Sequence, residues 1–312
     1  MVRCFPERLA VSFGTRLGQL GFFLRLRRSV GEENLTIAFP ELSQSERRRI
    51  LRRSYENLGR TLVEIARLPT LSDDAIRARA RYDPASLQYL AHATGRGKGV
   101  IFITAHLGNC ELLALSHALH HKPFHVVGRA LRNPLFDRDI LRMRARVGNV
   151  ISRRQDFSSM RKMILHMKAG GTVGIVIDQC PRRGVVVPFF GKDTLCHRGP
   201  AMLALRTGAV VVPAFIRPDH EVDGGRILYV GPEVRVERGK TSEESVRLLT
   251  ARMQEIIENE VRARPQEWLW THKRWKRAPT KVASYSRSAR RKRRSEKKWT
   301  EHERRATDAE TT

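Results

Sequence analysis

From residue 100 onward, short apolar runs with the length of buried strands alternate with stretches that have helical periodicity. The apolar runs cover residues 100–105, 124–128, 172–178 and 209–216, and the helical stretches include residues 110–121 and 158–169. Such alternation is typical of a parallel sheet that is covered by helices on both faces. We therefore predict an α/β fold with a mostly parallel central sheet.

The rest of the chain divides into three regions by composition. Residues 29–98 have helical periodicity, with a helix start at Ser43–Glu46. The C-terminal residues are rich in Ser, Arg and Lys and almost lack aliphatic side chains, which predicts disorder. The expected organisation is an N-terminal helix, a helical region, an α/β core and a basic disordered tail, at residues 1–28, 29–98, 99–277 and 278–312.

The charge of the chain is extreme for its length of 312 residues. The formal net charge is +27, of which +7 lies in residues 277–312 (12 Lys and Arg, 5 Asp and Glu) and +20 in the remainder. A body this basic favours anionic partners: nucleic acid, anionic lipid headgroups or an acidic protein. No recognition fold or stacking platform for nucleic acid is visible, so we expect no specific nucleic-acid partner.

Cysteine and histidine usage argues against disulfide and metal frameworks. The four cysteines are scattered and form no CxxC pair, which excludes a zinc ribbon and suggests a reducing compartment. His117 and His121 are four residues apart on one predicted helix, a spacing that can bind zinc. No Cys or acidic residue at a fitting distance completes that site, so we expect no metal.

The apolar N-terminal stretch, residues 9–24, contains Arg16 and Gln19 and is closed by further arginines. A spanning helix needs about 20 predominantly apolar residues, so no membrane span is predicted here. An apolar face with basic flanks suits a helix that lies in the membrane interface. The alternative is a terminal helix that packs on the domain.

The first strand of the core ends at His106, and a Gly-Asn turn leads to Glu111 at the start of an apolar helix. On one regular helix, positions five apart lie roughly 140° from each other, so the pair requires the turn between them. A carboxylate bonded to one imidazole nitrogen fixes the tautomer and leaves the other nitrogen as a base. The alternative is a histidine at a strand end that a neighbouring acid merely caps.

His106 and Glu111 resemble the His-x-x-x-x-Glu motif of the glycerolipid acyltransferase superfamily. Four further segments, in the same order, resemble the lipid A biosynthesis acyltransferases. They are residues 33–42 (ENLTIAFPEL); residues 56–60 (ENLGR) with Glu64; Asp178 and Gln179 with residues 187–191 (VPFFG) and 199–209; and residues 265–275 (PQEWLWTHKRW). The resemblance extends over residues 9–277.

The resemblance implies that His106 is the general base of acyl transfer and that Glu111 orients it. It also implies an arginine near residue 144 that stabilises the oxyanion or binds substrate phosphates. We expect this residue to be Arg144, with Arg142 and Arg129 as the alternatives. A solvated helix face is the other explanation for each of them in so basic a chain.

Three more residues are expected at the site. Asp178 ends a buried strand at the same sheet edge as His106, where a buried acid needs a partner. The alternative is that Asp178 caps the following turn. Gly108 and Asn109 are expected to shape the turn after the first strand, with backbone amides that face the oxyanion.

The resemblance implies an enzyme that moves an acyl chain from an acyl-carrier-protein or coenzyme A thioester to a hydroxyl of a lipid A precursor. No cofactor beyond that co-substrate is expected, and the absence of a Gly-x-Ser-x-Gly elbow fits a reaction without an enzyme nucleophile. The expected partners are acyl carrier protein, an anionic lipid or glycolipid acceptor and the membrane surface. The expected location is the cytoplasmic face of a bacterial inner membrane, with peripheral or monotopic attachment.

Two alternatives stay open at this point. The acceptor is either the lipid A precursor or another glycolipid or lysophospholipid. The same histidine and carboxylate, acting on water, would make the protein a thioesterase or hydrolase. Activity that requires a hydroxyl acceptor would exclude the hydrolase.

Overall fold

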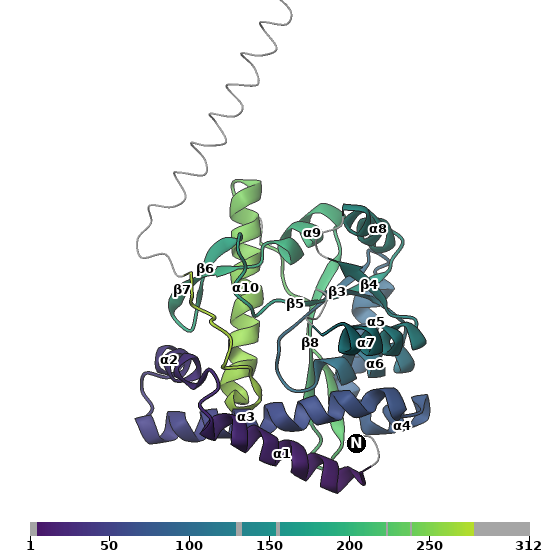
Figure 1. Cartoon of the computed structure of the whole chain (residues 1–312). Helices are drawn as coiled ribbons and strands as arrows, with labels where there is room; N and C mark the ends of the chain where they lie inside the picture. The colour runs from purple at the N-terminus through teal and green to yellow at the C-terminus, as the bar shows by residue number, and fades with distance from the viewer. Residues whose placement is uncertain (1–4, 129–132, 154–156, 223, 238, 278–312) are drawn as a thin grey trace, which may run out of the picture.

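The computed structural model describes residues 5–277 apart from 129–132, 154–156, 223 and 238. Its centre is a seven-stranded sheet with the strand order β1-β9-β8-β2-β5-β3-β4 (Figure 1). The strands are β1 (Ala80–Tyr82), β2 (Val100–Thr104), β3 (His125–Gly128), β4 (Val150–Arg153), β5 (Thr172–Val176), β8 (Val210–Pro218) and β9 (Arg226–Val230). Apart from the antiparallel pair β8 and β9, the described neighbours in this sheet are parallel, which confirms the predicted α/β fold. The tail predicted at 278–312 lies outside the described residues.

Helices cover both faces of the sheet (Figure 1). They are α1 (Glu7–Phe23), α2 (Arg28–Ala38), α3 (Gln44–Arg67), α4 (Asp73–Arg79), α5 (Pro84–Gly95), α6 (Cys110–His120), α7 (Pro134–Arg146), α8 (Phe157–Lys168), α9 (Gly199–Thr207) and α10 (Ser242–Ala263), with short 3-10 turns at Leu68–Thr70 (η2) and Pro265–Glu267 (η3). Side chains alternate along a strand. Ile103 of β2 therefore belongs to the buried cluster that contains Met253 of α10, whereas Phe102 belongs to the cluster with Leu90 of α5.

Side-chain caps explain where two of these helices begin. Ser43 and Glu46 form a capping box at the start of α3, in which each side chain bonds the backbone N–H of the other residue. The carbonyl oxygen of the Asn109 side chain accepts a hydrogen bond of 3.0 Å from the backbone N–H of Leu112 at the start of α6. The helix start predicted at residues 43–46 is thus confirmed.

Two strands were not predicted. Strand β1 interrupts the region that was expected to be only helical, and it pairs with β9. Strand β7 (Lys192–Cys196) pairs with β6 (Val185–Phe189) as a separate antiparallel hairpin. Both strands are short, and each is stabilised by backbone hydrogen bonds to a neighbouring strand. The periodicity of their own sequence therefore does not predict them.

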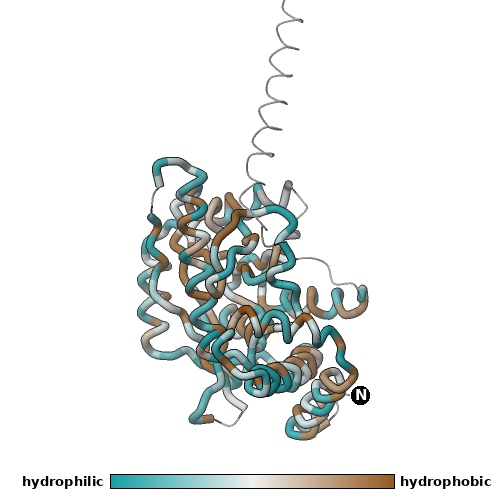
Figure 2. Tube along the Cα trace, turned by 90° about the vertical axis from the view of Figure 1, so that its left-hand side faces the viewer, coloured by the Kyte–Doolittle hydropathy of each residue, from teal (hydrophilic) through white to brown (hydrophobic). Residues whose placement is uncertain are grey.

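Helix α1 lies against α3 through glycines. A Cβ atom at Gly18 would lie 2.1 Å from the Tyr55 carbonyl oxygen, and one at Gly59 would lie 2.1 Å from the Gly14 carbonyl oxygen. Only glycine permits this approach of the two backbones. In Figure 2 the helix beside the N-terminal label carries hydrophobic residues along much of its length.

The opposite face of α1 is an exposed apolar stripe. Its members are Leu9, Phe13, Leu17, Leu20 and Leu24, which are 40–62% exposed. Among the described residues, no helix combines the length and the apolar character that crossing a membrane requires.

Candidate functional site

His106 and Asp178 meet because of the register between two neighbouring parallel strands. Thr104 of β2 lies opposite Val176 of β5, so the residues two positions beyond them face each other at the carboxyl edge of the sheet. Nδ1 of His106 lies 2.8 Å from Oδ1 of Asp178, and the backbone N–H of His106 donates to Oδ2 at 2.9 Å. This edge is where ligands bind in open α/β sheets.

Asp178 is held as a buried carboxylate. Its side chain is 3% exposed, and Nε1 of Trp268 donates a third hydrogen bond to Oδ2 at 2.8 Å. Burial by itself would raise the pKa of Asp178. Electrostatic attraction to the His106 ring and the three hydrogen bonds lower it by more than burial raises it. The pKa of Asp178 therefore lies well below its usual range, and the group is ionised at neutral pH.

The Asp178 carboxylate determines the tautomer of His106. An ionised carboxylate only accepts hydrogen bonds, so Nδ1 of His106 carries the proton and Nε2 presents its lone pair. Burial would lower the pKa of His106, but attraction to Asp178, their hydrogen bond and the Glu111 charge raise it overall. Nε2 lies 3.4 Å from the side-chain amide nitrogen of Gln179, and the His106 side chain is 33% exposed. The arrangement suits a general base that acts through Nε2.

His106 was expected to donate a hydrogen bond to Glu111, but its partner is Asp178. Glu111 and Arg144 form a bidentate ion pair. Nε of Arg144 donates to Oε2 of Glu111 at 2.9 Å, and Nη2 donates to Oε1. Both side chains are about 15% exposed. The reason is the strand register, which brings Asp178 to His106 and leaves Glu111, in the first turn of α6, facing α7. The catalytic role of Glu111 remains a prediction.

The turn residues have structural partners. The N–H of Gly108 donates to the Glu267 carbonyl oxygen at 3.2 Å, so this amide is not free to face an oxyanion, contrary to expectation. Gly108 has a positive φ of 65°, which the tight turn requires. Asn109 is buried, caps α6 and donates from its side chain to Glu64 at 3.0 Å.

Of the two alternatives to Arg144, the structure describes Arg142. Arg142 is exposed on α7. Arg129 lies outside the described residues. Arg144 is thus paired with a partly buried carboxylate at the site, whereas Arg142 is exposed to solvent.

Two residues beside His106 were missed as site residues. Gln179 follows Asp178 and reaches Nε2 of His106, and His272 accepts a hydrogen bond of 3.2 Å from the N–H of Cys180. Burial lowers the pKa of His272, so its ring is neutral and can accept this bond. Both residues lie in the family-like segments 178–179 and 265–275, which was the available signal.

An apolar cavity of about 610 Å³, including its opening to solvent, lies between α6 and the sheet. It extends from the level of Glu111 to that of His117, a distance of about 9 Å along the helix axis. Leu113, Ala114, Phe102 and other mainly apolar side chains line it. This apolar lining matches the chemistry of an acyl chain.

The far end of the cavity carries two polar side chains that bond each other. The Tyr82 hydroxyl lies 2.5 Å from Nδ1 of His117. Burial lowers the pKa of His117 to about 3, so its ring is neutral. Nε2 of His120 bonds the Ala80 carbonyl oxygen at 2.7 Å. Within the described part of the chain, no three His, Cys, Asp or Glu side chains gather as metal ligands.

Comparison with known proteins gives a consistent set of relatives. The family profile of the bacterial lipid A biosynthesis acyltransferases matches residues 1–277. The lipid A biosynthesis lauroyltransferase of Escherichia coli (strain K12) is 26% identical over 284 residues, which cover 89% of each chain. The palmitoleoyltransferase of the same strain is 28% identical over 283 residues, again with 89% of each chain covered. A phosphatidylinositol mannoside acyltransferase of Mycobacterium tuberculosis (strain ATCC 25618 / H37Rv) is 26% identical over 166 residues, which cover 51% of this chain and 52% of that protein.

Proposed function

Because the chain belongs to the bacterial lipid A biosynthesis acyltransferases and is an acyltransferase, we propose that it moves a fatty acyl chain from an acyl-carrier-protein thioester to a hydroxyl of a lipid A precursor. Coenzyme A is the alternative carrier. The observation that carries the proposal is the His106–Asp178 pair beside an apolar cavity. A base and a chain-binding cavity are the two parts that this reaction requires.

The reaction needs no covalent intermediate on the enzyme. Nε2 of His106 takes the proton of the acceptor hydroxyl while that oxygen attacks the thioester carbonyl carbon. The tetrahedral intermediate then collapses, the carbon–sulfur bond breaks, and the thiolate takes the proton back from Nε2. Asp178 stays ionised throughout and stabilises the imidazolium.

The acyl chain occupies the cavity between α6 and the sheet, with its thioester at the level of Glu111. Arg144 has five N–H donors, and the ion pair with Glu111 uses two of them. The remaining donors are available to the developing oxyanion or to a substrate phosphate. Asp178 acts on the substrate only through His106.

The N-terminal helix attaches the enzyme to the cytoplasmic face of the inner membrane. The exposed stripe of α1 includes Leu17 and Leu20, and the exposed Arg16, Arg25 and Arg27 lie on or directly beyond this helix. Apolar side chains beside arginines favour the interface of an anionic membrane. The attachment is therefore peripheral or monotopic, with α1 lying along the membrane.

The test is acyl transfer from radiolabelled acyl carrier protein to a panel of lipid acceptors. Wild type is compared with His106→Ala, and His92→Ala is the matched control because His92 is exposed on α5. We expect transfer to a phosphorylated glucosamine lipid by wild type and by the control, and none by His106→Ala. Transfer that survives His106→Ala would refute the mechanism.

Two other outcomes would change the substrate class. Release of free fatty acid without transfer to any acceptor would identify a thioesterase that uses the same histidine. Transfer to a mannosylated phospholipid in preference to the glucosamine lipid would identify a different acceptor. The likeness to the phosphatidylinositol mannoside acyltransferase is the reason to include that lipid.

A further inference from the structure

A short segment after α10 closes over the strand end that carries His106. We call residues 264–269 the clamp. Its backbone pairs with the turn after β2, because the N–H of Gly108 donates to the Glu267 carbonyl and the N–H of Leu269 donates to the His106 carbonyl, both at 3.2 Å. Leu107 and Trp268 form the antiparallel bridge between these two bonds. The clamp thus holds the backbone directly after the His106 side chain, and the His106 N–H before it bonds Asp178.

The Trp268 side chain of the clamp reaches Asp178. The indole is 2% exposed, and its Nε1 donates to Oδ2 of Asp178 at 2.8 Å. The ring packs edge-on against Trp270 at a centroid distance of 4.6 Å and beside Phe189 at 5.9 Å. One carboxylate is therefore held on one side by His106 and on the other by an indole that cannot move freely.

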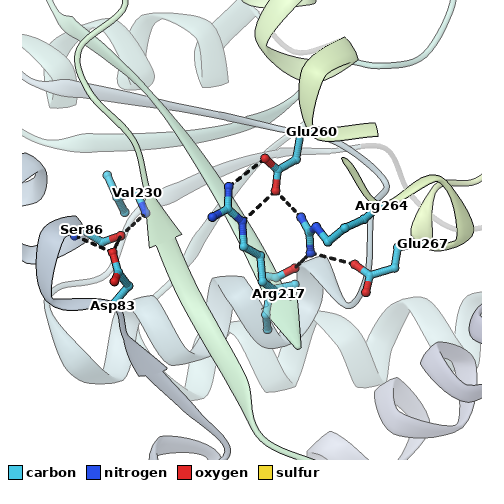
Figure 3. Close-up of polar contacts among 8 residues, drawn as sticks. Asp83, Ser86, Arg217, Val230, Glu260, Arg264 and Glu267 are labelled. Atoms are coloured by element: carbon cyan, nitrogen blue, oxygen red, sulfur yellow. Dashed lines mark hydrogen bonds and ion pairs between the residues drawn. The ribbon is translucent and has the colours of Figure 1, made fainter. Parts of the chain in front are cut away.

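Ion pairs fix the clamp to the body of the protein (Figure 3). Glu260 of α10 bonds Arg217 of β8 through two contacts of 2.8 Å and also bonds Arg264. Arg264 donates to Glu267 at 2.8 Å and to the Ile216 carbonyl at 3.0 Å. These bonds join the clamp to a strand and a helix of the core, so its position is set independently of Asp178.

We propose that Trp268 is a positioning residue for acyl transfer, which holds the Asp178 carboxylate in place against Nδ1 of His106. The inference rests on the proposed function only in its kinetic consequence, because the contacts themselves do not depend on the substrate. Trp268 does not touch the reacting atoms. It acts through Asp178. It fixes the position of the carboxylate relative to the His106 ring, and it reduces the negative charge that the ring experiences.

The sign of the effect follows from electrostatics. The indole N–H draws part of the negative charge of Asp178 away from the imidazole. Without this donor, the carboxylate holds the imidazolium more strongly and the pKa of His106 rises further. Other charged or titratable groups near this pair include Glu111, which is already paired with Arg144, and His272, whose pKa is lowered by burial. Burial raises the pKa of Cys110 to about 12, so it stays a neutral thiol.

The test removes the N–H donor and keeps the packing. Trp268→Phe, and the isosteric replacement of Trp268 by 3-benzothienylalanine, both lack the donor, and the second keeps the bicyclic shape. We expect the acid limb of kcat to move to higher pH by roughly half a unit, which is about a threefold loss of rate below the midpoint, with an unchanged KM. NMR titration of the His106 ring should show the same upward shift without any substrate.

Trp270→Phe is the matched control. Trp270 is also buried and donates through Nε1, but to the Pro265 carbonyl at 2.6 Å. We expect it to lose comparable stability without a change in the pH midpoint. The Trp268 effect should also vanish in an Asp178→Ala background, where the indole has no side-chain oxygen to bond, as a double-mutant cycle requires for a residue that acts through Asp178.

A midpoint that stays at the wild-type value, moves to lower pH or moves equally in Trp270→Phe would overturn the positioning role. So would an effect that persists in the Asp178→Ala background. A wild type without acyl transfer would instead refute the proposed function. The NMR titration would still decide the role of Trp268 in that case.

Discussion

Replacing Asp178 with Asn tests the pairing on which the mechanism depends. In the native protein, Oδ2 accepts from the His106 backbone and from Trp268, and Oδ1 accepts from Nδ1 of His106. An amide has one oxygen, and keeping the first two bonds turns its NH₂ group toward Nδ1. His106 must then accept at Nδ1 and carry its proton on Nε2. The base is in the wrong tautomer, although its position is unchanged.

The expected loss is large because base catalysis is removed and not merely weakened. General base catalysis contributes about 100- to 10,000-fold, so we expect kcat to fall by about 1,000-fold, or about 4 kcal/mol in the activation free energy. The pKa of His106 is raised in the native enzyme, and the active base is the neutral ring. The rate therefore falls as the pH drops through this pKa. Without the carboxylate the pKa decreases, and the acid limb of any residual activity moves to lower pH.

The assay is the pH profile of acyl transfer, with Glu111→Gln as the matched control. This variant makes the same change from carboxylate to amide, but at a residue that bonds Arg144. We expect it to leave the acid limb closer to the wild-type position than Asp178→Asn does. A wild-type rate and acid limb in Asp178→Asn, with both lost in Glu111→Gln, would refute our reasoning and restore the pairing of His106 with Glu111.

Three further predictions concern the surroundings of the site. Arg144→Met should lower the free energy of unfolding by about 2–4 kcal/mol in urea titrations, because it leaves the Glu111 carboxylate without its partner; equal stability of variant and wild type would contradict the ion pair. Ala114→Leu extends a side chain into the cavity beside α6, so the preferred acyl chain in a competition assay should become shorter, and an unchanged preference would place the chain elsewhere. Leu17→Ser with Leu20→Ser should weaken binding to anionic vesicles by about tenfold or more, since two apolar side chains no longer enter the interface. Vesicle binding at wild-type strength in that variant would exclude the stripe of α1 as the contact.

Much of the fold was predictable from local pattern. The alternation of apolar runs and helical stretches after residue 100 predicted the mostly parallel sheet, and Ser43 with Glu46 marked the start of α3. Such features depend on residues that are close in the chain, because helix caps and periodicity involve neighbours within a few positions. The His106 segment was recognised for the same reason, since its strand, turn and helix are contiguous.

The partner of His106 was decided only by tertiary structure. Glu111 is five positions away and fits the spacing, whereas Asp178 lies 72 residues along the chain and Trp268 a further 90. No local pattern specifies that β5 is the neighbour of β2, or that Thr104 and Val176 are in register. Strand pairing is determined by the burial of all the apolar faces together. That global packing brings His106 and Trp268 to the carboxylate of Asp178.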